Sequence, residues 1–171
     1  MSDLKNKKSL VIYFSRADEN YFGGSMKYVD KGNTEVIAEY IKEIANADLF
    51  KVEPLEPYSA SYAQCLEESK ERTKTHNAPI KEHVPDISSY EVLYVGSPVY
   101  WGGMPEELFT ALKDLDFTGK IIKPFVTHEG SGISNIPTQL KNLCQGATVV
   151  NPIAIVGSEV NSARDEIEDW L

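Results

Sequence analysis

The chain has 171 residues, of which 42% are hydrophobic and 25% are charged, and its net charge is −9. This length and composition are typical of one globular domain, so residues 1–171 are expected to form a single domain. The acidic balance argues against nucleic acid and against membrane surfaces, because both present anionic groups that attract basic residues. No segment reaches the roughly 20 apolar residues of a membrane span, and no signal-peptide pattern is present. We therefore expect a cytoplasmic protein.

Strand-like apolar runs alternate with helical patterns along the whole chain. Strands are expected near residues 9–14, 48–52, 92–97, 121–126 and 148–155, and helices near 34–45, 60–75, 105–115, 136–143 and 162–170. Repeated β–α units favour a parallel sheet with helices on both faces, and near-continuous apolar strands fit such a covered sheet. Five strands fit the doubly wound order 2-1-3-4-5. The sequence thus predicts an α/β fold.

The first candidate site lies where the first strand ends and the first helix begins. Ser15 ends the strand, and Gly32, Asn33 and Thr34 precede an amphipathic helix. A helix N-terminus offers free backbone N–H groups and a partial positive charge, so it binds phosphate readily. The alternative interpretation is that Asn33 or Thr34 simply caps the helix.

The segment 16–31 separates this strand from this helix and is much longer than an ordinary connection, which runs about 2–6 residues. It contains Tyr21, Phe22, Met26 and Tyr28 together with two glycines. Such a segment is either a functional lid or an insertion with little order. We expect a mobile flap beside the site.

A second loop follows the central strand and reads Ser97-Pro98-Val99-Tyr100-Trp101-Gly102-Gly103. Two adjacent aromatic residues with large rigid faces suit the stacking of a flat ring system. Backbone amides beside the glycines could bond to ring heteroatoms. The alternative is that Tyr100 and Trp101 pack under a neighbouring loop.

The third loop follows the fourth strand and reads Thr127-His128-Glu129-Gly130-Ser131-Gly132. Its glycines allow tight turns and close approach to a ligand. His128 and Glu129 could supply polar contacts or a proton, and a solvated loop without a ligand is the alternative. No histidine or cysteine spacing indicates a metal site, and Cys65 and Cys144 are expected to be free thiols.

Taken together, the three loops resemble those of the flavodoxin family. The family's phosphate motif, which ends in Thr-Gly-Asn-Thr, is matched at its start by Phe14-Ser15-Arg16 and at its end by Gly32-Asn33-Thr34-Glu35, with Lys31 at the middle threonine. The segment from Gly96 to Gly102 is the most specific match. The resemblance implies a flavodoxin-like fold that binds flavin mononucleotide (FMN), with the insertion near the flavin edge.

The resemblance also implies which residues contact the cofactor. They are predicted to come from all three loops, namely Ser15, Arg16, Gly32, Asn33, Thr34, Pro98, Val99, Tyr100, Trp101, Gly102, Thr127, Glu129, Gly130 and Gly132. Arg16 or Lys31 is expected to neutralise the phosphate. No residue stands out as a catalytic acid or base, which fits redox chemistry carried by the flavin.

The implied function is electron transfer between redox partner proteins or to small-molecule acceptors. One alternative is an NAD(P)H-dependent FMN or quinone oxidoreductase on the same fold, with the 16–31 insertion walling a substrate pocket. A second alternative is a cofactor-free binding module, which the lysine at the threonine position favours. The sequence leaves the oligomeric state open.

Overall fold

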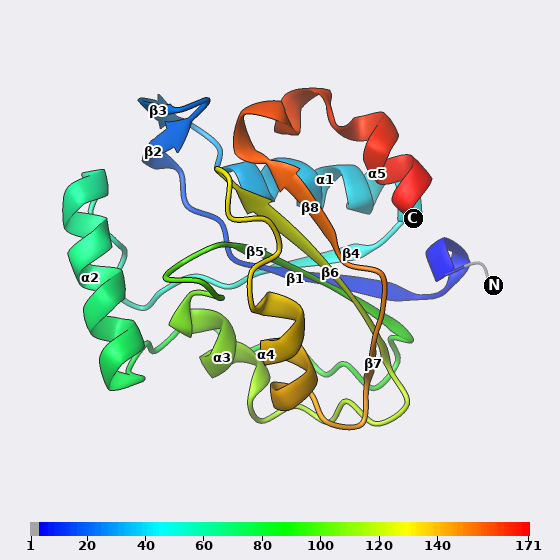
Figure 1. Cartoon of the computed structure of the whole chain (residues 1–171). Helices are drawn as coiled ribbons and strands as arrows, with labels where there is room; N and C mark the ends of the chain where they lie inside the picture. Colours follow the sequence, from blue (N-terminus) through cyan, green and yellow to red (C-terminus); the bar gives the residue numbers. More distant parts are fainter. Residues whose placement is uncertain (1–3) are drawn as a thin grey trace.

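The computed structural model describes residues 4–171 as an alternation of strands and helices (Figure 1). In chain order these are β1 (Ser9–Tyr13), β2 (Asp18–Phe22), β3 (Ser25–Val29), α1 (Asn33–Ala45), β4 (Asp48–Lys51), α2 (Tyr62–Thr75), β5 (Val92–Pro98), α3 (Glu106–Leu112), β6 (Ile121–His128), α4 (Ile136–Leu143), β7 (Thr148–Val149), β8 (Ile153–Val156) and α5 (Arg164–Trp170). Short 3-10 helices span Leu4–Asn6 and Gly157–Ser162. Within this range no helix is long and apolar enough to cross a membrane.

The main sheet is parallel and has the order β4-β1-β5-β6-β7, with β8 also paired to β6. This confirms the doubly wound order 2-1-3-4-5. The predicted fifth strand, 148–155, is split in two. Asn151 takes a positive φ of 42° and Pro152 has no N–H, so neither continues a regular strand. β7 pairs with the start of β6 and β8 with its end.

Helices cover both faces of the sheet, with α1 and α5 on one side and α3 and α4 on the other (Figure 1). The strands serve both layers because successive side chains alternate between faces. Leu10 and Ile12 join the cluster beneath α3 and α4, whereas Val11 and Tyr13 join the cluster beneath α1 and α5. All four are buried, which explains why residues 10–13 of β1 read as an unbroken apolar run.

The segment 16–31 forms an antiparallel hairpin, so the interpretation as an insertion with little order is wrong. β2 and β3 pair from Asp18↔Val29 to Phe22↔Ser25. Gly23 and Gly24, with φ of 68° and 85°, form a two-residue turn that requires two positive φ values. The hairpin lies above one end of α2, and both stand at the same side of the sheet (Figure 1). Whether it moves as a flap stays a prediction.

Candidate functional site

The three predicted loops meet at one cavity of about 290 Å³ outside the carboxyl ends of β1, β5 and β6. Ten of the predicted residues line it, namely Ser15, Arg16, Asn33, Thr34, Pro98, Val99, Tyr100, Trp101, Thr127 and Glu129. The predicted glycines Gly32, Gly102, Gly130 and Gly132 are not among its lining residues. The site therefore lies where a doubly wound sheet places its ligands.

The start of α1 is held directly against the end of β1. Gly32 precedes the helix in an extended conformation, and the Ser15 hydroxyl accepts the N–H of Glu35 at 3.0 Å. The N-cap residue of the helix is Gly32, which has no side chain to cap it. The alternative in which Asn33 or Thr34 caps the helix is therefore wrong. A Cβ on Gly32 would collide with the Ser15 hydroxyl and the Arg16 carbonyl. The glycine is thus needed for this close approach.

A pair of buried hydroxyls joins the first loop to the third. The side-chain oxygens of Thr34 and Thr127 lie 2.8 Å apart, and both residues are almost fully buried. Thr34 is in the first turn of α1, where the helix dipole is positive, and Thr127 lies near the end of β6. This end of the cavity therefore combines hydroxyl groups with the positive end of a helix.

Residues 100–103 form a tight turn that sends two adjacent aromatic side chains in different directions. Tyr100 and Gly103 exchange both backbone hydrogen bonds, at 2.7 and 3.1 Å. Trp101 and Gly102 between them have φ of 55° and 82°, the pattern of a type I′ turn. Trp101 stays 54% exposed, and its indole N–H donates to the Ser69 hydroxyl on α2 at 2.9 Å.

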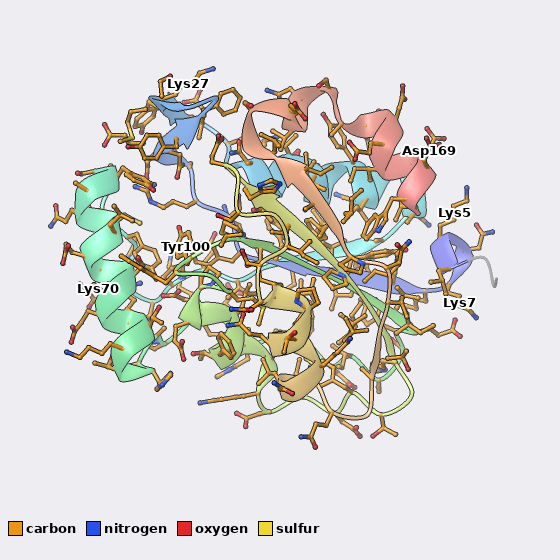
Figure 2. All side chains as sticks on the ribbon, in the orientation of Figure 1. Lys5, Lys7, Lys27, Lys70, Tyr100 and Asp169 are labelled. Atoms are coloured by element: carbon orange, nitrogen blue, oxygen red, sulfur yellow. The ribbon has the colours of Figure 1, made fainter. Side chains whose placement is uncertain are left out.

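Tyr100 belongs to both the cavity lining and the core. Its ring meets Phe14 and Tyr58 edge to face, with centroids 5.6 and 6.0 Å apart. Burial, followed by the neighbouring Cys65, raises the pKa of the Tyr100 hydroxyl well above its usual value. Figure 2 shows Tyr100 on the side of the sheet that faces α2. The alternative in which the aromatic side chains of this loop are packed away therefore describes Tyr100, whereas the Trp101 side chain is exposed.

The third loop is organised around His128. Its Nδ1 accepts the backbone N–H groups of Gly130 at 2.9 Å and Gly132 at 3.1 Å. Both glycines have positive φ, 124° and 65°. The two glycines thus shape the loop, and His128 and Ser131 join Glu129 in lining the cavity.

Replacing His128 with alanine should loosen this loop without unfolding the protein. The variant loses the acceptor for both glycine N–H groups, and a single hydrogen bond of this kind is worth about 0.5–1.5 kcal/mol. We expect amide hydrogen exchange at Gly130 and Gly132 to accelerate by about three- to ten-fold in NMR measurements. The exposed His83 provides the control, because its alanine variant should leave these two amides unchanged. Unchanged exchange in His128→Ala would show that His128 does not hold the loop.

The two cations expected to neutralise a phosphate have other partners. The Arg16 guanidinium donates to the carbonyls of Glu19, Ser59 and Ala60 and to the Asn20 side chain, over 2.5 to 3.0 Å. It therefore ties the hairpin to the segment before α2 while still lining the cavity. Lys31 pairs with Glu39 at 2.7 Å and is not among the lining residues.

One side of the cavity comes from the hairpin, whose segment was expected beside the site, and from α2, which the sequence analysis did not assign to it. We call this side the outer wall; it consists of Asn20 and Tyr21 from the hairpin and Tyr62, Cys65, Leu66 and Ser69 from α2. Tyr21 and Tyr62 meet edge to face, with centroids 4.9 Å apart. The four α2 residues are spaced so that they share one face of the helix. This spacing is the sequence pattern that could have identified them as a group. Nothing in the sequence places that face beside the other loops.

The fold and the site define a doubly wound α/β protein with a ligand cavity at the carboxyl ends of its strands. The chain belongs to the flavodoxin family, because the family model described as Flavodoxin matches residues 21–171. No curated protein matches the chain.

Solved structures share the fold over nearly the whole chain. A protein of Bacteroides uniformis ATCC 8492 that is classed with the flavoproteins has a TM-score of 0.74 at 21% identity, covering 96% of this chain and 97% of its own. A flavoprotein from Lactobacillus acidophilus NCFM in complex with FMN scores 0.59 at 18% identity, covering 91% and 97%. A Fusobacterium nucleatum flavodoxin bound to flavin mononucleotide scores 0.55 at 13% identity, covering 96% and 94%.

Proposed function

We propose that this chain binds FMN in the cavity and acts in electron transfer in the cytoplasm. The observation that carries the proposal is the convergence of the β1, β5 and β6 loops on one cavity bordered by the start of α1. When bound, FMN supplies the redox chemistry, and the protein supplies binding, orientation and electrostatics. Its partners would be redox proteins or small-molecule acceptors, and neither nucleic acid nor a membrane.

The chemistry of the lining fits a phosphorylated flat ring. Ser15, Asn33 and Thr34 border the cavity at the helix N-terminus, where a phosphate is favoured. Pro98, Val99 and Trp101 border it on the β5 side, where apolar and aromatic surface suits a ring. The missing Cβ of Gly32 lets the helix start approach the strand end closely enough to make this polar corner.

The cofactor-free alternative depended on Lys31, and the structure weakens it because Lys31 is paired with Glu39 outside the cavity. A visible absorption spectrum decides between the two. The protein is mixed with excess FMN, the excess is removed, and the spectrum is recorded before and after unfolding. We expect flavin absorbance at about one equivalent per chain. A protein that retains no flavin would contradict the proposed function.

The outer wall favours a second candidate, the NAD(P)H-dependent FMN or quinone oxidoreductase. A carrier that exchanges electrons with large partners needs only an exposed ring edge, whereas a walled compartment suits a small molecule. Oxidation of NADPH by the FMN-loaded protein, with and without a quinone, tests this. Turnover without any added partner reductase would favour the enzyme, and negligible turnover would favour the carrier.

A further inference from the structure

The loop after β5 holds its tryptophan in a backbone conformation that residues other than glycine rarely adopt. Trp101 has a φ of 55°, and among the described residues it is the only one with a positive φ that carries a large apolar side chain. A type I′ turn normally takes glycine, asparagine or aspartate at this position. Backbone strain of this kind is concentrated at binding sites, where the surrounding structure maintains it. The strained turn therefore indicates that the direction of the indole matters for the site.

The indole is fixed to α2 by a hydrogen bond. The Trp101 Nε1–H donates to the Ser69 Oγ at 2.9 Å, and the Ser69 hydroxyl donates in turn to the Leu66 carbonyl at 3.0 Å. The proton of Ser69 is thereby committed to its own helix, so its oxygen serves as the acceptor for the indole. Ser69 is only 3% exposed. Its hydroxyl is therefore held in one direction at the place where the loop after β5 reaches toward α2 (Figure 1).

This bond keeps a half-exposed side chain in place beside the cavity. Within the described part of the chain, it is the only hydrogen bond that the Trp101 side chain makes. The Trp101 residue is 54% exposed, and both Trp101 and Ser69 line the cavity. An exposed side chain on a turn changes rotamer readily unless a neighbour holds it. The orientation of the indole at the cavity thus depends on Ser69.

We propose that Ser69 is a positioning residue, which holds the Trp101 indole as a preformed wall of the flavin site. This deepens the proposed function and rests on it. A ligand that must order a mobile side chain loses part of its affinity, whereas a side chain that is already fixed removes that loss. The flat face of the indole offers surface to a ring system, and its orientation decides whether that face meets the ring. Ser69 therefore acts on FMN through Trp101 and not by a contact of its own.

The first test observes the indole in the apo-protein and needs no cofactor. The chain has two tryptophans, so NMR shows two indole N–H signals, and the loss of one in Trp101→Phe or Trp170→Phe identifies them. We expect Ser69→Ala to accelerate the exchange of the Trp101 indole N–H with water by about three- to ten-fold, because the bond to Ser69 protects it. Alanine is a good helix former, so α2 should stay folded in this variant.

Ser162→Ala is the matched control. The Ser162 hydroxyl also donates to the carbonyl three residues before it, that of Glu159 at 3.1 Å, and Ser162 is not among the residues that line the cavity. This variant removes the same kind of serine bond without touching the indole. The exchange of the Trp101 N–H should therefore be unchanged in it.

The second test measures the affinity for FMN by titration of the apo-protein. Ser69→Ala should raise the Kd for FMN by about three- to ten-fold, and Ser162→Ala should leave it unchanged. In the Trp101→Phe background, whose ring has no N–H, Ser69→Ala should change the Kd by less than about two-fold. This cycle separates a role through Trp101 from a direct contact between Ser69 and the cofactor.

Three results overturn the positioning role while a retained flavin spectrum leaves FMN binding intact. If exchange of the Trp101 N–H is the same in Ser69→Ala and Ser162→Ala, Ser69 does not hold the indole, and this comparison stands even where Trp101→Phe fails to fold. If both variants bind FMN equally well, the site does not need a fixed indole. If Ser69→Ala weakens binding equally with either residue at position 101, Ser69 acts without Trp101. A chain that takes up no FMN overturns the proposed function and the positioning role together.

Discussion

Replacing Gly32 with alanine should remove most of the affinity for FMN. The added Cβ would meet the Arg16 carbonyl oxygen at 2.6 Å and its carbon at 2.8 Å, and would also collide with the Ser15 hydroxyl. Two of these atoms are backbone, so the contact is relieved only when the start of α1 moves away from the end of β1. That movement breaks the bond from the Glu35 N–H to Ser15 and opens the predicted phosphate corner. We expect the Kd for FMN to rise at least about thirty-fold, since both a helix-terminus interaction and a hydroxyl contact are displaced.

The measurement is a titration of the apo-protein with FMN, followed by quenching of flavin fluorescence. Overpacking of this kind also costs stability, about 1–3 kcal/mol, so folding is checked by circular dichroism. Gly119→Ala is the control, because Gly119 has a φ of 75° and open space around its Cβ position, away from the cavity. It should lose about 1 kcal/mol of stability through backbone strain while binding FMN normally. Equal FMN affinities in the two variants would refute the proposed corner.

The sheet and its three loops could be predicted because they depend on local patterns. β1, β5 and β6 are largely buried on both faces, so each appears as a mostly apolar run, and each is followed by a loop of glycine, hydroxyl or aromatic residues. The carboxyl ends of parallel strands lie at one edge of the sheet, so these loops had to meet. The family match and the sheet order confirm the predicted family and fold.

The hairpin could not be predicted with the same ease. Its strands read DENYF, which is mostly half-buried, and SMKYV, which is mostly exposed, and neither has a buried apolar face. The sequence did contain the Gly23-Gly24 turn signal. The two strands beside this turn, however, are held by long-range contacts rather than by a buried apolar face. Arg16 reaches Ser59 and Ala60, more than forty residues away. No local pattern reports such a contact.

The directions of the side chains were the second feature that could not be predicted from the sequence. Tyr100 and Trp101 are neighbours, and only the positive φ of Trp101 decides that one ring packs inward and the other outward. The same holds for His128, whose role as an acceptor for two glycine N–H groups depends on how the loop turns back on itself. The three loops and the hairpin segment could therefore be assigned to the site from the sequence, whereas the place of α2 and the function of individual side chains needed the structure.

Removing the Arg72 guanidinium should cost the protein a large part of its stability, and Arg72→Met is the variant to test. Arg72 on α2 pairs with Glu107 on α3 at 2.9 Å, and the Glu107 side chain is 0% exposed. The Tyr58 hydroxyl also donates to that carboxylate, at 2.9 and 3.1 Å. Burial and then Glu107 raise the pKa of Tyr58, which keeps its hydroxyl protonated as a donor. Without Arg72, Glu107 keeps one donor and no cation, and breaking a buried pair in this way costs about 3–5 kcal/mol.

Urea unfolding of Arg72→Met should therefore show a free energy of unfolding lower by about 3 kcal/mol, the smaller value reflecting the 18% exposure of the Arg72 side chain. Arg164→Met breaks the exposed pair with Glu43 and should cost about 1 kcal/mol or less. The double variant Arg72→Met/Glu107→Gln should recover much of the lost free energy of unfolding, because it also removes the buried charge of Glu107. If the single and double variants were equally unstable, the loss would come from packing of the Arg72 side chain over the Tyr58 ring, 4.0 Å from its centroid. Since Tyr58 also contacts Tyr100, this network connects the stability of the α2–α3 side to the cavity.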